Sequence, residues 1–260
     1  MTAVVLNGLR TAWREWGAGD RTLLCLHPLG QEAAFFADLA PALGPGWRVA
    51  AYDQRGHGAA ADRPAEGFAQ MVDDAEAALD RCGARHVAGF SMGGAVAADL
   101  APRRPLAALA LVATPAAGLP VFAERACAER RGGIDAIMDE TVARWFGPGA
   151  AGPAVDRARA SLARMTPDGF DAAWRAFATF APYEARAAAL PPTLCLAYGD
   201  DLSTPPAVLD AIAATIRAAG GTAERATVAG AGHMGLLQKP AETGAAIRAF
   251  FESVAAEAGT

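Results

Sequence analysis

Short apolar runs alternate with amphipathic segments along residues 1–113 and again from residue 192 onward. Continuous apolar runs are typical of strands covered on both faces of a parallel sheet, whereas apolar positions three and four residues apart indicate helices. Their alternation predicts an α/β fold with a mostly parallel central sheet flanked by helices. The expected strands are 22–26, 48–52, 84–90, 106–113, 193–198 and 224–228. The expected helices are 35–43, 68–82, 94–101, 206–219 and 242–256.

Two further strand candidates lie at the start of the chain, at residues 4–6 and 11–16. Asn7 and Gly8 lie between them and form a dipeptide that favours a tight hairpin turn. These residues therefore predict a β-hairpin at one edge of the sheet.

The alternation stops in the middle of the chain, where no convincing buried strand is found from about residue 116 to residue 186. This block predicts helices over 131–146, 156–165 and 169–180, the last with Asp168 as its N-cap. The interpretation is one α/β core domain, residues 1–115 and 187–260, with residues 116–186 inserted as a helical cap.

Composition narrows the class of protein. The 260 residues are 53% hydrophobic, which suffices for one large domain with a full core. A net charge of −5 favours neither nucleic acid nor an anionic membrane as a partner, and no segment has the features of a bilayer span or a secretory signal. The four cysteines show no metal-type or disulfide-type spacing, and Cys25 and Cys195 lie in strand-like runs. We therefore expect reduced core cysteines and a cytoplasmic location; the oligomeric state stays open.

Residues 89–93, Gly-Phe-Ser-Met-Gly, carry the first candidate chemistry. They follow an apolar run and precede a segment of small, helix-prone residues, so the motif lies on an expected strand–turn–helix unit. In that setting the turn exposes the serine hydroxyl as a nucleophile, and the glycines allow the helix to pass close to the strand. Ser91 is therefore the candidate nucleophile. The alternative is a glycine-rich turn with an incidental serine.

A serine nucleophile on such a turn requires an acid and then a histidine further along the chain. Asp200 and Asp201 follow the expected strand 193–198, and His233 follows the strand 224–228. His233 is the candidate general base, and one of the two carboxylates would orient its ring. The alternative for His233 is a loop histidine satisfied by backbone groups.

Transition-state stabilisation requires two backbone N–H donors near the serine. Met92, directly after Ser91, is one candidate, and the loop after strand 22–26 should supply the other. Proline has no N–H, so Leu29 rather than Pro28 is the expected donor. Residues 27–30 could equally be an ordinary turn.

Together these segments resemble the α/β-hydrolase family over nearly the full chain, and within it the 3-oxoadipate enol-lactonase-like group and small esterases. The resemblance rests on residues 27–30, 53–58, 89–94, 201–206 and 232–233, with Arg-Trp-Phe at 144–146 in the cap. It implies an α/β-hydrolase fold, a Ser–acid–His triad, a small-molecule ester or lactone as substrate, and no metal or organic cofactor.

The resemblance also bears on the choice of acid. Family members usually have two residues between the acid and Thr-Pro, which here selects Asp201; counting forward from Gly199 would select Leu202, which cannot serve. Asp201 is therefore the expected triad acid, with Asp200 as the alternative.

Three residues are expected to line the substrate pocket in addition to the catalytic groups: His27, Trp145 and Met234. Apolar residues after His233 and aromatic residues in the cap indicate a less polar substrate than a small dicarboxylic lactone. Trp145 could equally be an ordinary core residue.

The expected function is hydrolysis of an ester or enol-lactone through an acyl-enzyme on Ser91. One alternative is a tailoring esterase, thioesterase or cyclase for a larger apolar metabolite, which a roomy aromatic pocket would favour; an arginine reaching the pocket would favour an acidic lactone. A second alternative, from another class, is a non-catalytic ligand-binding member of the fold.

Overall fold

The computed structural model describes residues 1–258 and contains one eight-stranded sheet with the strand order β1-β2-β4-β3-β5-β6-β7-β8. The strands are β1 Thr2–Leu6, β2 Leu9–Trp16, β3 Arg21–Leu26, β4 Trp47–Tyr52, β5 His86–Phe90, β6 Ala108–Val112, β7 Thr193–Tyr198 and β8 Ala223–Val228. β1 and β2 form the expected edge hairpin, and β2 pairs antiparallel with β4. All other neighbours pair in parallel, so the predicted mostly parallel sheet is confirmed.

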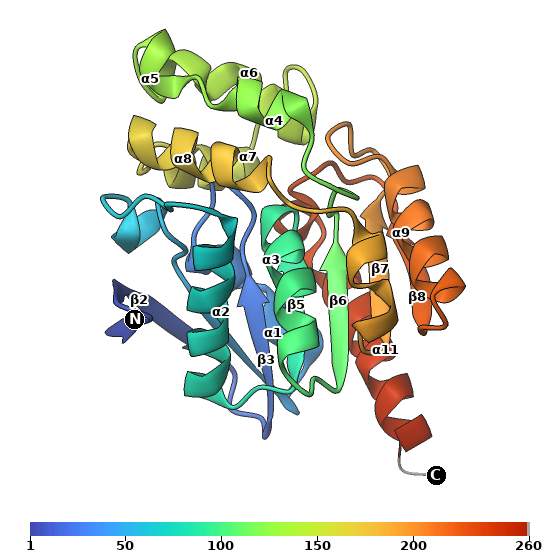
Figure 1. The fold of residues 1–260 in the computed structure, drawn as a ribbon. Helices are drawn as coiled ribbons and strands as arrows, with labels where there is room; N and C mark the ends of the chain where they lie inside the picture. Colours follow the sequence, from blue (N-terminus) through green and yellow to red (C-terminus); the bar gives the residue numbers. More distant parts are fainter. Residues whose placement is uncertain (259–260) are drawn as a thin grey trace.

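Helices cover both faces of this sheet (Figure 1). They are α1 Leu39–Leu43, α2 Phe68–Cys82, α3 Met92–Leu100, α9 Pro206–Ala218, α10 Gly235–Gln238 and α11 Pro240–Ala258. α2 and α3 pack together in front of the sheet in the view of Figure 1, whereas α1 packs against α11, which passes behind it. Every residue of β6 is buried, as expected of a strand covered on both faces.

The segment between β6 and β7 is helical and lies across the end of the sheet at which the parallel strands finish (Figure 1). Its helices are α4 Pro120–Arg125, α5 Ala128–Arg131, α6 Asp135–Phe146, α7 Pro153–Leu162 and α8 Pro167–Phe177. We call α4–α8 and their connecting loops the cap. The parts of the chain before and after the cap form the core.

Short 3-10 helices occupy several connections. They are Ala33–Phe36, Gly58–Ala60, Ala101–Arg103, Tyr183–Ala185 and Ala187–Ala189. The helix expected over 35–43 is therefore replaced by a 3-10 turn and the short helix α1.

Two details of the cap differ from expectation. The helix expected over 131–146 is divided between α5 and α6 because Gly132 and Gly133 adopt φ values of 94° and 116°, which an α-helix excludes. Asp168 is not the N-cap of α8. The hydroxyl of Thr166 caps this helix by accepting the backbone N–H of Gly169 at 3.0 Å, which leaves Asp168 within the first turn, where an acidic side chain favours the helix dipole.

Polar contacts connect the cap to the core. The Arg164 guanidinium donates to Glu32 at 2.9 Å, and the Thr166 hydroxyl donates to the carbonyl of Ala61 at 3.0 Å. Cys25 and Cys195 are fully buried, as expected. Among the described residues, none of the helices has both the length and the apolar character needed to span a lipid bilayer.

Candidate active site

Ser91 occupies a sharp turn between β5 and α3. Its φ of 50° and ψ of −116° lie in a region that L-residues rarely adopt. The Ser91 N–H donates to the carbonyl of Val112 at 2.8 Å, and the Ser91 carbonyl accepts the N–H of Gly94 at 2.9 Å. These two hydrogen bonds hold Ser91 in this conformation. The folded chain therefore retains the backbone strain typical of such residues, about 1–3 kcal/mol.

The glycines beside Ser91 have the predicted role of allowing close approach. A Cβ on Gly89 would collide with the backbone of Gly93, and a Cβ on Gly93 would collide with the carbonyl of Leu26 at the end of β3. Helix α3 can therefore begin directly above the strand ends only because both positions lack a side chain.

The structure brings the three expected catalytic side chains together. The Ser91 hydroxyl lies 2.9 Å from Nε2 of His233, and Nδ1 of His233 lies 2.8 Å from Oδ2 of Asp201. An ionised carboxylate can only accept, so Nδ1 carries the proton and Nε2 is left to accept the Ser91 hydroxyl. This arrangement is the one a serine nucleophile requires.

The choice between the two neighbouring aspartates follows from burial. Asp201 is buried, and its second oxygen, Oδ1, accepts the backbone N–H groups of Ser203 at 2.7 Å and Thr204 at 2.9 Å. Asp200 is exposed, and its backbone N–H donates to the carbonyl of Ala231. The loop thus fixes the Asp201 carboxylate toward His233 and leaves Asp200 in solvent.

The loop that follows β3 brings Leu29 to the wall of the pocket. Gly30 donates its N–H to Nε2 of His57 at 3.1 Å, and Gln31 donates its N–H to the carbonyl of Pro28 at 3.1 Å, so the loop is fixed on both sides of Leu29. Met92 is the first residue of α3, and N–H groups in the first turn of a helix lack partners within the helix. Leu29 and Met92 therefore stay the candidate oxyanion donors.

Two buried histidines hold this loop. His27 donates Nδ1–H to the carbonyl of Pro28 at 3.0 Å and accepts the N–H of Gln54 at Nε2 at 2.9 Å. His57 donates Nδ1–H to the carbonyl of Arg55 at 2.8 Å. Burial lowers the pKa of His27 to about 4 and the pKa of His57 to about 3. Both rings are therefore uncharged at neutral pH, and their hydrogen bonds hold the loop in place.

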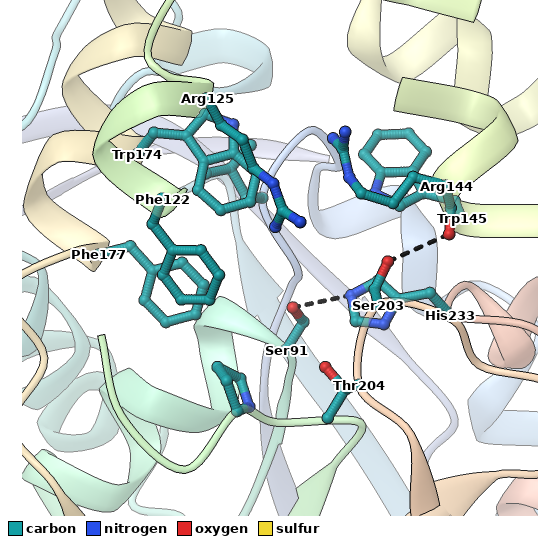
Figure 2. Close-up of a pocket in the computed structure, with 12 residues that line it drawn as sticks. Ser91, Phe122, Arg125, Arg144, Trp145, Trp174, Phe177, Ser203, Thr204 and His233 are labelled. Carbon is teal, nitrogen blue, oxygen red and sulfur yellow. Dashed lines mark hydrogen bonds between the residues drawn. The ribbon is translucent and has the colours of Figure 1, made fainter. Parts of the chain in front are cut away.

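A pocket lies between the Ser91 hydroxyl and the cap, with free space of only about 20 Å³, which is room for about one water molecule. From the core it is lined by Leu29, Ser91, Pro115, Ser203, Thr204 and His233. From the cap it is lined by Phe122, Arg125, Arg144, Trp145, Trp174 and Phe177 (Figure 2).

The alpha/beta hydrolase family model matches residues 4–246. The chain belongs to the alpha/beta hydrolase family. Its strand order, the turn at Ser91 and the Ser91–His233–Asp201 geometry are those of an α/β-hydrolase.

Solved structures similar to this hydrolase include several enzymes. A thermophilic esterase from Thermogutta terrifontis, determined with malate bound, has a TM-score of 0.87 and 26% identity over 98% of this chain and 99% of that one. A hydrolase from Pseudomonas aeruginosa has a TM-score of 0.83 and 28% identity over 93% and 94% of the two chains. The enol-lactonase from Burkholderia xenovorans shares the fold, with a TM-score of 0.86 and 24% identity over 96% and 100%.

A curated relative by sequence is the dihydrolipoyllysine-residue acetyltransferase component of the acetoin cleaving system of Cupriavidus necator. It is 35% identical over 103 residues, which are 38% of this chain and 28% of that protein. The chain therefore matches little more than a quarter of the length of this relative.

Two of the expected pocket residues of this hydrolase require correction. His27 and Met234 both have no exposed surface, and neither lines the pocket. His27 is enclosed by the loop it supports, and Met234 turns into the hydrophobic core just before α10 begins. Trp145 does line the pocket, as expected.

Residues that the motifs did not single out complete the cap wall. Phe122 and Arg125 lie three residues apart on α4, a helix absent from the sequence-based expectation. Pro120 at the first position of α4 is a typical helix-start signal and could have indicated it. Within residues 1–258, no group of three or more His, Cys, Asp or Glu side chains is arranged to hold a metal ion.

Proposed function

We propose that this α/β-hydrolase cleaves a carboxylic ester or lactone through an acyl-enzyme on Ser91. The observation that carries the proposal is the continuous hydrogen-bonded chain from the Ser91 hydroxyl through His233 to Asp201 at the base of the pocket.

In the first step His233 Nε2 takes the proton of Ser91 as the serine oxygen bonds to the substrate carbonyl carbon. The tetrahedral intermediate collapses, the bond from carbon to the leaving oxygen breaks, and that oxygen takes the proton from Nε2. A water molecule then repeats the sequence on the acyl-enzyme and releases the carboxylic acid. With a lactone, the alcohol remains attached to the acyl group, and the product is one hydroxy acid.

Two features of the site suit this reaction. Asp201 holds the His233 ring and offsets the positive charge that develops on it. We assign the N–H groups of Leu29 and Met92 as the donors to the oxyanion, and a donor of this kind is worth about 3 kcal/mol of barrier.

The similar structures support this substrate class because one is an esterase and another, alike in fold, is an enol-lactonase. We propose a small-molecule substrate and, on the cysteine usage, a cytoplasmic location.

Labelling by a fluorophosphonate, together with hydrolysis of short-chain 4-nitrophenyl esters, tests the proposal. We expect the wild type to be labelled at Ser91 and to turn over. Ser91→Ala should not be labelled, and Ser91→Ala and His233→Ala should each lose about 10⁴- to 10⁶-fold in kcat. Ser161→Ala, a serine of α7 outside the pocket, is the matched control and should behave as the wild type.

Full turnover by Ser91→Ala would contradict the nucleophile assignment. A wild type that neither labels nor turns over would favour the non-catalytic ligand-binding alternative.

A further inference from the structure

Two arginines of the cap enter the pocket without an acidic partner. Arg125 ends α4 and Arg144 lies in the last turn of α6, and Figure 2 shows both side chains reaching from the cap into the pocket above Ser91. Among residues 1–258, no carboxylate oxygen lies within 4.0 Å of either guanidinium. Neighbouring cap arginines differ: Arg131 pairs with Glu140, and Arg159 pairs with Asp139. Arg130 of α5 also has no carboxylate within this distance, but it is exposed to solvent and does not line the pocket of Ser91.

The two guanidiniums lie beside aromatic rings, and the charge of Glu140, which pairs with Arg131, offsets only part of their own. The Arg125 guanidinium lies 5.1 Å from the ring centroid of Trp174 and 5.4 Å from that of Phe122, and the Arg144 guanidinium lies 6.0 Å from that of Trp174. Burial lowers the pKa of both groups, and the charge of Arg125 contributes to lowering the pKa of Arg144 to about 10. Both remain charged at neutral pH, so two like charges share one aromatic wall with only partial compensation.

The same two side chains border the outside of the cap. Arg125 and Arg144 also line an open hollow of about 540 Å³ on the cap surface, together with Arg130 and Arg131. Glu124 and Glu140 are the acidic residues of this hollow. Because Arg125 and Arg144 face both spaces, they form the wall between the outer hollow and the pocket that contains Ser91.

A third pocket residue has an unsatisfied donor. The indole N–H of Trp174, which lines the pocket between the two guanidiniums and Phe177, is buried without an acceptor. Buried polar groups normally have hydrogen-bond partners. The two guanidiniums that reach the pocket are donors and cationic, so a ligand that pairs with them brings acceptor oxygens and a negative charge. A carboxylate matches guanidinium geometry and can accept two bonds from one arginine.

We propose that Arg125 and Arg144 form an arginine gate that binds a carboxylate of the substrate. The substrate is then a small ester or lactone that carries a carboxylate separate from its scissile carbonyl and passes between the two arginines from the outer hollow. The gate binds that carboxylate while the ester group reaches Ser91. The ester part of this inference rests on the proposed function; the binding of a carboxylate does not.

Two matched esters test the gate: 4-nitrophenyl hydrogen glutarate, which is anionic, and methyl 4-nitrophenyl glutarate, which is neutral. We expect the wild type to prefer the anionic ester by about ten- to a hundredfold in kcat/KM, the size expected for hydrogen bonds to charged groups. Arg125→Gln and Arg144→Gln should each reduce this preference and together abolish it, because activity on the anionic ester should fall further than activity on the neutral ester. Arg144→Lys should restore part of the preference, and Arg159→Gln is the control that should leave it unchanged.

Glutarate binding separates the gate from the catalytic proposal. We expect glutarate to change the tryptophan fluorescence of Ser91→Ala, which keeps both arginines, and to leave that of the Arg125→Gln/Arg144→Gln protein unchanged. Glutarate binding without ester cleavage would overturn the proposed function and support the gate. Cleavage of both esters with equal efficiency, or equal losses on both esters in the arginine variants, would overturn the gate and leave the proposed function in place.

Discussion

The core side and the cap side of the pocket differ in how completely their polar groups are bonded. On the core side, Ser91, His233 and Asp201 form one hydrogen-bonded chain, and Asp201 accepts two further backbone N–H groups. On the cap side, the guanidiniums of Arg125 and Arg144 have no carboxylate partner in the described chain. The two sides enclose the same pocket, but the polar groups named on the core side are paired and the two guanidiniums on the cap side are not.

This difference separates the chemistry from the selection of the ligand. A catalytic group must be held in one geometry before the substrate arrives, and complete hydrogen bonding does so. A binding group that is to recognise a ligand is better left unpaired, because an existing partner would have to be displaced. The core side therefore has the features of a preorganised reaction site, and the cap side has those of a binding surface.

The largest expected effect that would sharpen this comparison comes from the two neighbouring aspartates. Asp201→Asn removes the acceptor that fixes the His233 tautomer, so we expect kcat to fall by about 10⁴-fold. Asp200→Asn makes the same chemical change at an exposed position and should alter kcat by less than about threefold. Steady-state kinetics on one 4-nitrophenyl ester would measure both. Similar losses in the two variants would show that the loop, not the bonded carboxylate, sets the activity.

A smaller effect is expected where the two sides touch, at Gly30. This residue has a φ of 83°, and a Cβ would lie 2.6 Å from the ring of Trp145. Gly30→Ala should therefore displace either the Leu29 loop or Trp145 and lower kcat/KM by about tenfold or more, since small misplacements are costly in catalysis. Gly149→Ala is the matched control: its φ is 73° with open space around the new Cβ.

The control should lose about 1 kcal/mol of stability from the backbone alone and keep its kcat/KM. Thermal unfolding measured beside kinetics would distinguish the two effects. An unchanged kcat/KM in Gly30→Ala would mean that the sides are not coupled through Trp145.

The smallest effect is a loss of folding stability at acidic pH, caused by buried histidines on the core side. The folded-state pKa values of His27 and His57, about 4 and about 3, lie below the ordinary value of 6.5. Between these values the unfolded chain binds more protons, so their contribution to stability is complete above pH 6.5 and is lost as the pH falls toward 4 and 3. Each such histidine should lower the free energy of unfolding by about 1.4 kcal/mol per pH unit in this window.

Urea unfolding at pH 7.5, 6 and 5 would measure this loss. His86 also has a pKa lowered to about 4, and it lies away from the site, against Trp47 and Phe251. His86→Phe should therefore reduce the slope of the unfolding free energy against pH by the contribution of one histidine. The contributions of His27 and His57 should stay. A stability that is flat from pH 7.5 to 5 would contradict neutral roles for His27 and His57.

The sequence was most informative where a local requirement leaves few choices. The turn at Ser91 needs glycines on both sides, and the resemblance to α/β-hydrolases implies an acid and then a histidine after later strands, so these residues could be placed before the structure was known. The split between α5 and α6 depends on Gly132 and Gly133 adopting positive φ, which glycine permits but does not require.

The pocket residues were harder to place because the direction of a side chain depends on tertiary packing. His27 lies two residues before Leu29, and Met234 directly follows His233. The side chains of both are nevertheless buried in the interior. Arg125 and Phe122 lie on a short helix with no motif, and their position over Ser91 depends on how the cap folds back across the sheet. Proximity in sequence was therefore a poor guide to which side chains line the pocket.

The carbonyl of Trp145 accepts the backbone N–H of His233 at 2.7 Å. A cap that swings away as a unit would break this bond and release the loop that carries the catalytic base. Contacts that keep the cap against the core therefore also keep His233 in place. Contacts between the cap and the part of a substrate distant from its scissile carbonyl have the same effect. Shortening a substrate at that end should then slow its turnover as well as weaken its binding.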